Sequence, residues 1–229
     1  MSKRSETGKK LGRKWKLKGH AHENLFNANF DKRKNINYSE PSSDCEVDDN
    51  VLREVASLYA GGRTVSLKSG STAQFHLGNI PELSDKDSFK ASLHKKTIRN
   101  KPATCGVHSR SWAEQLAVLK SPSFWAKYLG KGDFYVQLEK DQKNYAYFSM
   151  KDVIRFICER TEWRLLETGR IKGDLPEKTS GGKAIKAAVL TFEYRPEHGS
   201  FVLGAHGGKN GYRFCDILKQ HLKHKVLGN

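Results

Sequence analysis

Residues 133–160 constrain the fold most, because two alternating runs lead directly into an amphipathic helix pattern. Residues 133–139 and 145–149 alternate apolar and polar side chains around a polar turn, which predicts a β-hairpin. The next eleven residues, MKDVIRFICER at 150–160, gather their apolar side chains on one helical face. Strands and a helix in such close succession indicate a mixed α/β domain.

Other segments extend this pattern, and none repeats another. We expect helices at 20–30, 51–59, 112–119, 123–129 and 214–223, and strand pairs at 64–68 with 72–77 and at 187–194 with 200–204. The sequence therefore predicts an α/β fold with a mixed central β-sheet flanked by helices. It forms a single domain, residues 19–229, preceded by a flexible basic arm at residues 1–18.

The charge of the chain points to a polyanionic partner. It has 41 Lys and Arg against 25 Asp and Glu, a formal net charge of +16. Residues 1–35 hold eleven basic residues against three acids, whereas residues 36–62 hold six acids against Arg53 alone. This alternation favours basic walls around an acidic centre, although solvated charged faces are the alternative. The basic arm is interpreted as a phosphate-contacting segment or as a solubilising tail.

Cysteine spacing and hydropathy exclude several classes of protein. Cys45, Cys105, Cys158 and Cys215 form no CxxC pair, so we expect reduced thiols rather than a zinc site or a disulfide framework. No apolar run approaches the roughly 20 residues of a membrane-spanning helix. We therefore expect a cytoplasmic protein without a membrane partner.

Three charged residues and one serine are the candidate catalytic groups. Glu23 lies in the expected helix at 20–30, Asp44 lies in a loop, and Ser66 and Lys68 lie in the strand that follows. Successive side chains alternate along a strand, so Ser66 and Lys68 share one face. Carboxylates in so basic a chain would repel phosphate unless a divalent cation lay between them. Mg²⁺ needs only one or two such ligands, and it activates water for phosphodiester hydrolysis.

These residues resemble the PD-(D/E)XK nuclease superfamily, the fold of many type II restriction endonucleases. Asp44 matches the Asp of its motif, Lys68 the lysine and Glu23 the helical glutamate. The resemblance covers residues 19 to about 80, the expected catalytic core. It implies Mg²⁺ bound by Asp44 and Glu23, sequence-specific cleavage of double-stranded DNA and a homodimer.

Ser66 departs from the motif, which has Glu or Asp at this position. Glu23, Glu46, Asp48 or Asp49 are candidates to supply the missing charge. A nuclease-like protein that no longer cuts is the other interpretation. A third treats Lys68 as an exposed strand lysine and Asp44 as a turn residue.

The later part of the chain offers candidates for DNA contact, at about 85–111 and 187–215. Lys, Asn and Arg side chains suit the reading of base edges, and here they lie beside glycines that let a backbone approach closely. The candidates are Arg195, Lys209, Asn210 and Arg213, with Arg110 as a phosphate contact. The alternative for 204–213 is a flexible surface loop.

The expected function is therefore that of a type II-like restriction endonuclease that hydrolyses DNA with Mg²⁺. The alternative is a non-catalytic basic DNA- or RNA-binding protein, and the choice between DNA and RNA as substrate stays open.

Overall fold

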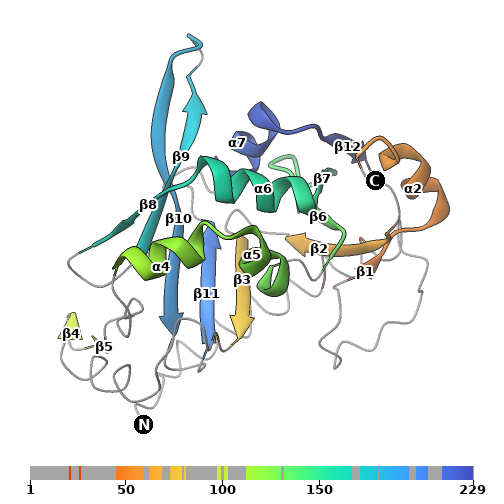
Figure 1. Cartoon of the computed structure of the whole chain (residues 1–229). Coiled ribbons are helices and arrows are strands. Elements are labelled where there is room, and N and C mark those ends of the chain that lie inside the picture. The colour runs from red at the N-terminus through yellow and green to blue at the C-terminus, as the bar shows by residue number, and fades with distance from the viewer. Residues whose placement is uncertain are drawn as a thin grey trace.

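The structure is a computed structural model. It describes residues 45–58, 62–68, 73–78, 112–129, 132–166, 171–179, 181–195, 200–205 and 213–228, with Ala21, Phe26, Ile80, 97–98 and 101–102. Two five-stranded sheets and the helices packed on them make up this part of the chain (Figure 1). The expected α/β class is confirmed. The expected single central sheet is replaced by two sheets.

The first sheet is mixed and carries the predicted catalytic strand. Its order is β1 (Cys45–Glu46), β2 (Thr64–Lys68), β6 (Phe134–Leu138), β7 (Asn144–Ser149) and β12 (Lys225–Gly228). Strands β2 and β6 run parallel, and the other neighbours are antiparallel. Strand β2 thus lies between an antiparallel and a parallel neighbour.

The second sheet is antiparallel throughout. Its order is β3 (Ala73–Gly78), β11 (Ser200–Ala205), β10 (Ala184–Arg195), β9 (Ile171–Lys178) and β8 (Glu162–Leu165). A separate short pair joins β4 (Thr97–Ile98) to β5 (Lys101–Pro102). The β9–β10 hairpin extends beyond the rest of this sheet (Figure 1).

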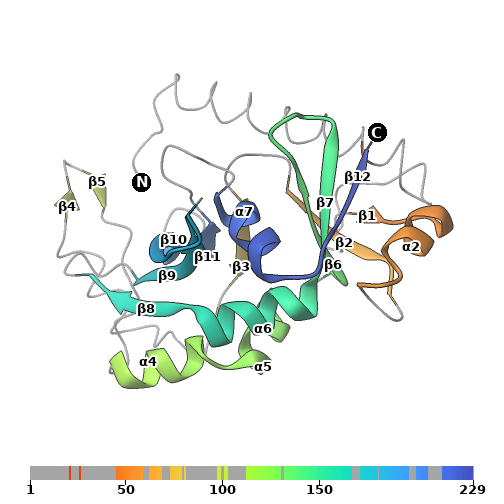
Figure 2. The ribbon, with the colours of Figure 1, turned by 90° about the horizontal axis from the view of Figure 1, so that it is seen from above.

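Three of the five described helices begin at a residue whose side chain caps the first turn. The helices are α2 (Asp49–Val55), α4 (Trp112–Leu119), α5 (Pro122–Tyr128), α6 (Met150–Arg160) and α7 (Arg213–His221). Asp48, Ser121 and Ser149 accept hydrogen bonds from the first turns of α2, α5 and α6. From above, α4, α5 and α6 lie along one side of the molecule, and α7 lies between the two sheets (Figure 2).

One hydrophobic cluster includes residues from both sheets and from four of these helices. The Trp125 ring of α5 stacks on Trp163 of β8 and meets Phe192 of β10 edge-on. A second cluster lies on the opposite face of the first sheet, between that sheet, α2 and Phe26. The first sheet is therefore covered on both faces, and β2 contributes Val65 and Leu67 to the second cluster.

Most of the predicted elements are confirmed, and one pairing is wrong. The helices at α4, α5, α6 and α7 and the β6–β7 and β10–β11 hairpins lie where they were expected. The predicted hairpin of 64–68 with 72–77 is wrong, because β2 and β3 belong to different sheets. The apolar face of β2 enters the second cluster, whereas Phe75 of β3 enters the first. Each strand therefore belongs to the sheet whose packing buries its own apolar face.

Reciprocal hydrogen bonds hold the start of β2 against the start of β6. The Asp133 carboxylate accepts from the Thr64 backbone N–H at 2.9 Å and from the Thr64 hydroxyl at 2.6 Å. The Asp133 backbone N–H donates to the Thr64 carbonyl at 2.8 Å. Two glycines make room for this contact. A Cβ at Gly62 would lie 2.1 Å from the Asp133 carboxyl, and one at Gly132 would lie 2.9 Å from the Ser66 nitrogen.

Gly62→Ala is expected to destabilise the protein, because its methyl group would displace the Asp133 carboxylate from Thr64. Overpacking together with the lost charged hydrogen bonds should lower the free energy of unfolding by about 2–4 kcal/mol. Urea unfolding followed by circular dichroism measures this change. Gly181→Ala is the matched control, because no atom lies within 4 Å of its added Cβ. Equal stability of the two variants would contradict the role of this contact.

Candidate functional site

Strand β2 presents its two candidate catalytic residues on one face, as predicted. Val65 and Leu67 are buried, whereas Ser66 and Lys68 are half-buried on the opposite side of the strand. Ser66 is the central residue of β2, and Lys68 is its last residue. In open sheets with parallel strands, ligands bind at the carboxyl ends of those strands.

The parallel neighbour β6 adds two residues to this face. Ser66 pairs with Tyr135, and Lys68 pairs with Gln137. Side chains of paired residues lie on the same side of a sheet. The four residues therefore form two adjacent rows across β2 and β6, and sequence reasoning had found only the two on β2.

Aromatic packing and hydrogen bonding hold these rows in place. The Lys68 ammonium lies 5.0 Å from the centre of the Phe75 ring of β3, a cation–π distance. The Tyr135 hydroxyl donates to the Gln137 side-chain oxygen. Burial raises the pKa of Tyr135 well above its ordinary value, so this hydroxyl keeps its proton. The Tyr135 ring also contacts Phe214 at the start of α7.

Glu46 is a described carboxylate that shares the face of Ser66. It pairs with Thr64 across the β1–β2 ladder, and Thr64 and Ser66 are two residues apart on β2. Diagonal neighbours across a ladder lie about 7–8 Å apart, within reach of a long side chain. Glu46 is half-buried.

The other two acids proposed as substitutes have structural roles. Asp48 accepts hydrogen bonds from the Asn50 and Val51 backbone N–H groups and so begins α2. Asp49 forms an ion pair with Arg63. Asp48 and Asp49 lie outside β1, whereas the β1–β2 register places Glu46 on the face of Ser66.

Several predicted site residues lie outside the described residues: Glu23, Asp44, Arg110, Lys209 and Asn210. Cys45, the residue after Asp44, pairs with Val65, the residue before Ser66. Asp44 is thus joined directly to the strand that neighbours β2.

Two predicted DNA contacts are on described elements. Arg195 is the last residue of β10. Arg213 is the first residue of α7, and its Nε donates to the Glu177 carboxylate at 2.9 Å. This ion pair joins α7 to β9, so Arg213 contributes to the packing of the second sheet.

Among the described residues, no group of three or more His, Cys, Asp or Glu side chains is placed to hold a metal ion. Both carboxylates assigned to Mg²⁺, Glu23 and Asp44, lie outside that part of the chain. The described face offers the Ser66 hydroxyl and the Glu46 carboxylate. Both are hard oxygen donors, the chemistry that Mg²⁺ prefers.

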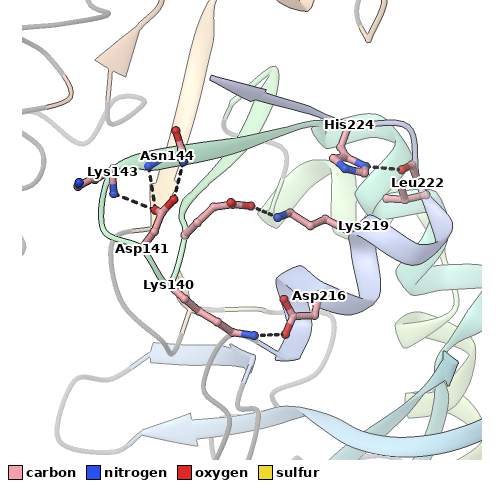
Figure 3. Close-up of polar contacts among 9 residues, drawn as sticks. Lys140, Asp141, Lys143, Asn144, Asp216, Lys219, Leu222 and His224 are labelled. Atoms are coloured by element: carbon pink, nitrogen blue, oxygen red, sulfur yellow. Dashed lines mark hydrogen bonds and ion pairs between the residues drawn. The ribbon is translucent and has the colours of Figure 1, made fainter. Parts of the chain in front are cut away.

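A pocket of about 200 Å³ lies between α7 and the turn that joins β6 to β7 (Figure 3). It is lined by Glu139, Lys140, Asp141, Cys215, Asp216 and Lys219. The Lys140 ammonium lies 2.7 Å from the Asp216 carboxylate, and Lys219 pairs with Glu139.

The third carboxylate of the pocket closes the β6–β7 turn. Asp141 accepts from the backbone N–H groups of Asn144 and Lys143, and these bonds lower the pKa of its carboxyl group. Ion pairs to α7 balance the charges of Lys140 and Glu139, and backbone hydrogen bonds balance that of Asp141. The pocket is therefore a structural contact between α7 and the β6–β7 hairpin.

The thiol in this pocket is unsuited to nucleophilic chemistry. Burial, followed by the neighbouring Asp216 charge, raises the pKa of Cys215 to about 12. The thiolate is the nucleophilic form, so Cys215 is inert at neutral pH. Burial likewise raises the pKa of Cys158 to about 11. Both cysteines are free and buried, as expected for reduced thiols.

Comparison with known proteins finds no relative: no family model, no curated protein and no solved structure matches the chain. In the part of the chain that the structure describes, no helix has the length and apolar character needed to cross a membrane. The site must therefore be interpreted from its own geometry.

Cys158 and Cys215 are expected to resist alkylation in the folded protein. Their raised pKa values and burial should slow the reaction with iodoacetamide at pH 8 by about 100-fold or more relative to the unfolded chain. Mass spectrometry of the two cysteine-containing peptides, with and without guanidinium, measures the ratio. Equal labelling under both conditions would show that these thiols are accessible and reactive.

Proposed function

We propose that the protein is a Mg²⁺-dependent endonuclease that cleaves duplex DNA at a specific sequence, as type II restriction enzymes do. One observation carries the proposal. Ser66 and Lys68 share a face of β2, which runs parallel to β6, and β2 also pairs with the strand that begins directly after Asp44. The net charge of +16 supports a polyanionic substrate.

Each residue has a role in this proposal. Asp44 is the principal ligand of Mg²⁺, Glu23 assists it, and Ser66 occupies the acid position of the motif. The bound ion would lower the pKa of the attacking water and polarise the scissile phosphate. The Lys68 ammonium stabilises the negative charge that develops on the phosphate or orients the water. Packing against Phe75 restricts the positions that this ammonium can take.

Glu46 supplies the carboxylate that the motif lacks at position 66. Its strand places it on the same face as Ser66, one row along the β1–β2 ladder. A carboxylate from a neighbouring strand restores the negative charge that a metal ligand set requires.

The substrate also suggests an assembly and a location. Symmetric cleavage of both strands of a duplex favours a C₂ homodimer. A protein with reduced thiols that acts on DNA belongs in the cytoplasm.

The second candidate is a basic DNA- or RNA-binding protein without catalysis. Two observations favour it: a serine replaces the acid at position 66, and the Lys68 ammonium packs on an aromatic ring. Such a protein would bind nucleic acid with a steep salt dependence and without a metal requirement.

Asp44→Asn and Lys68→Ala are expected to lower DNA cleavage by at least about 100-fold while duplex binding is retained. The assay compares mixed-sequence DNA incubated with Mg²⁺ or with EDTA and resolved on a gel. Glu159→Gln and Lys151→Ala remove the same charges at exposed positions of α6 and serve as controls. Circular dichroism verifies that each variant is folded.

The pattern of products separates the two candidates. Discrete Mg²⁺-dependent bands support the sequence-specific nuclease, and a Mg²⁺-dependent smear retains the nuclease without the specificity. Intact but retarded DNA favours the binding protein. Full activity of both Asp44→Asn and Lys68→Ala would overturn the assigned site.

Glu46→Gln is expected to reduce cleavage by about 10- to 100-fold, because the amide keeps the shape of the side chain and removes its charge. The reduction should be partly recovered at higher Mg²⁺, since a lost ligand weakens the affinity for the ion. Glu54→Gln, at an exposed position of α2, is the control. Wild-type rates at every Mg²⁺ concentration would exclude Glu46 from the site.

A further inference from the structure

The β9–β10 hairpin continues past its neighbours as a two-stranded ribbon. This ribbon, residues 175–188, is called the arm from here on and is distinct from the basic N-terminal segment 1–18. Strand β8 pairs with β9 only as far as Asp174, and β11 pairs with β10 only from Leu190 onward. A β-bulge separates Ala188 from Leu190 at the point where the arm leaves the sheet. Bulges bend a strand and increase its twist, so the arm departs from the plane of the sheet. Figure 1 shows it extending beyond the rest of the described chain.

Contacts with α7 hold the arm, although an isolated hairpin is marginally stable in water. The Arg213 guanidinium binds the Glu177 carboxylate. The Gln220 side chain accepts from the Lys178 backbone N–H at 2.8 Å and donates to the Lys178 carbonyl at 3.4 Å. Gln220 thus satisfies the backbone N–H and carbonyl of Lys178 at the outer edge of β9, as a neighbouring strand would. The arm is ordered before it meets a partner, which reduces the entropy lost on binding.

The end of the arm is a narrow turn. The Thr179 backbone N–H donates to the Lys183 carbonyl at 2.9 Å. Gly182 has a φ of +76°, a conformation that glycine adopts without strain, and no atom lies within 4 Å of a Cβ built at Gly181 or Gly182. The turn therefore has open space around both glycines.

The exposed charge of the described part of the arm is positive. The acids at its base are neutralised, since Asp174 pairs with Arg164 and Glu177 pairs with Arg213. Lys178 and Lys183 are exposed on either side of the turn. Within the described residues, neither ammonium forms an ion pair, so both are available to an anionic partner.

The two lysines lie on opposite sides of the turn. Lys178 is the last residue of β9, and Lys183 is the residue directly before β10. A ribbon that enters a groove tip first has a phosphate strand on each side. One lysine therefore stands at the end of each strand of the ribbon, beside one wall of the groove.

We propose that the arm enters the major groove of duplex DNA, with Lys178 and Lys183 each neutralising a phosphate on one of the two strands. The major groove of B-DNA, about 12 Å wide, admits a two-stranded β-ribbon. The lysines position the protein and read no sequence, because the phosphates are common to all sequences. This inference rests on the proposed cleavage of duplex DNA, and it assigns the arm as a surface that binds the duplex.

The test compares Lys178→Ala/Lys183→Ala with the matched double variant Lys120→Ala/Lys151→Ala, whose exposed lysines lie directly after α4 and in α6. Binding to a fluorescent mixed-sequence duplex is measured by anisotropy in EDTA, over roughly 50 to 300 mM KCl. The arm variant should lower the magnitude of the slope of log K against log[salt] by about two, one per lost phosphate contact. The control should keep the wild-type slope.

The binding measurement tests the role of the arm independently of DNA cleavage. A reduced slope in the arm variant alone supports the proposal, even where the wild-type protein cuts no DNA and the proposed nuclease activity fails. Equal slopes for the two double variants overturn it and leave any observed cleavage intact. The same measurement is made on double-stranded RNA of the same sequence. If the arm variant lowers the slope more on this RNA than on DNA, the proposal is also overturned, because the deep, narrow major groove of RNA does not admit a ribbon.

Discussion

The parallel pairing of β2 with β6 is the interaction on which the rest of the structure depends. It joins segments 69 residues apart, and the Thr64–Asp133 contact fixes where the two strands begin to run together. Since a shift of one residue would turn every side chain to the opposite face, this contact also determines which residues face α2 and which face the candidate site. The same pairing brings Tyr135 and Gln137 beside Ser66 and Lys68.

Local patterns made much of the fold predictable from the sequence. The β6–β7 hairpin and α6 were predictable because the contacts that define them lie within a few residues in the chain. The pairing of β2 was not, since a serine- and glycine-rich turn after Lys68 looks the same whether the next strand is a neighbour or crosses to another sheet. Strand β9 was missed because Gly173 and Pro176 are residues that strands generally disfavour.

The same distinction between local patterns and long-range pairing applies to the candidate site. Alternation within one strand was enough to predict that Ser66 and Lys68 share a face, and that required no knowledge of tertiary structure. The contributions of Glu46, Tyr135 and Gln137 depend on which strands lie beside β2 and in which register. Tyr135 and Gln137 have no local motif in the sequence. An experiment that locates Asp44 relative to Ser66 would connect the two halves of the motif.

Helix α7 holds the arm through the backbone of Lys178 and leaves its side chain free to vary in sequence. Gln220 binds main-chain atoms that every residue except proline possesses. The side chain at 178 can therefore be exchanged without loss of the support beneath it. Mutation and selection are then free to vary the chemistry of the exposed surface while the scaffold keeps its shape, so a change of the side chain at this position need not compromise folding.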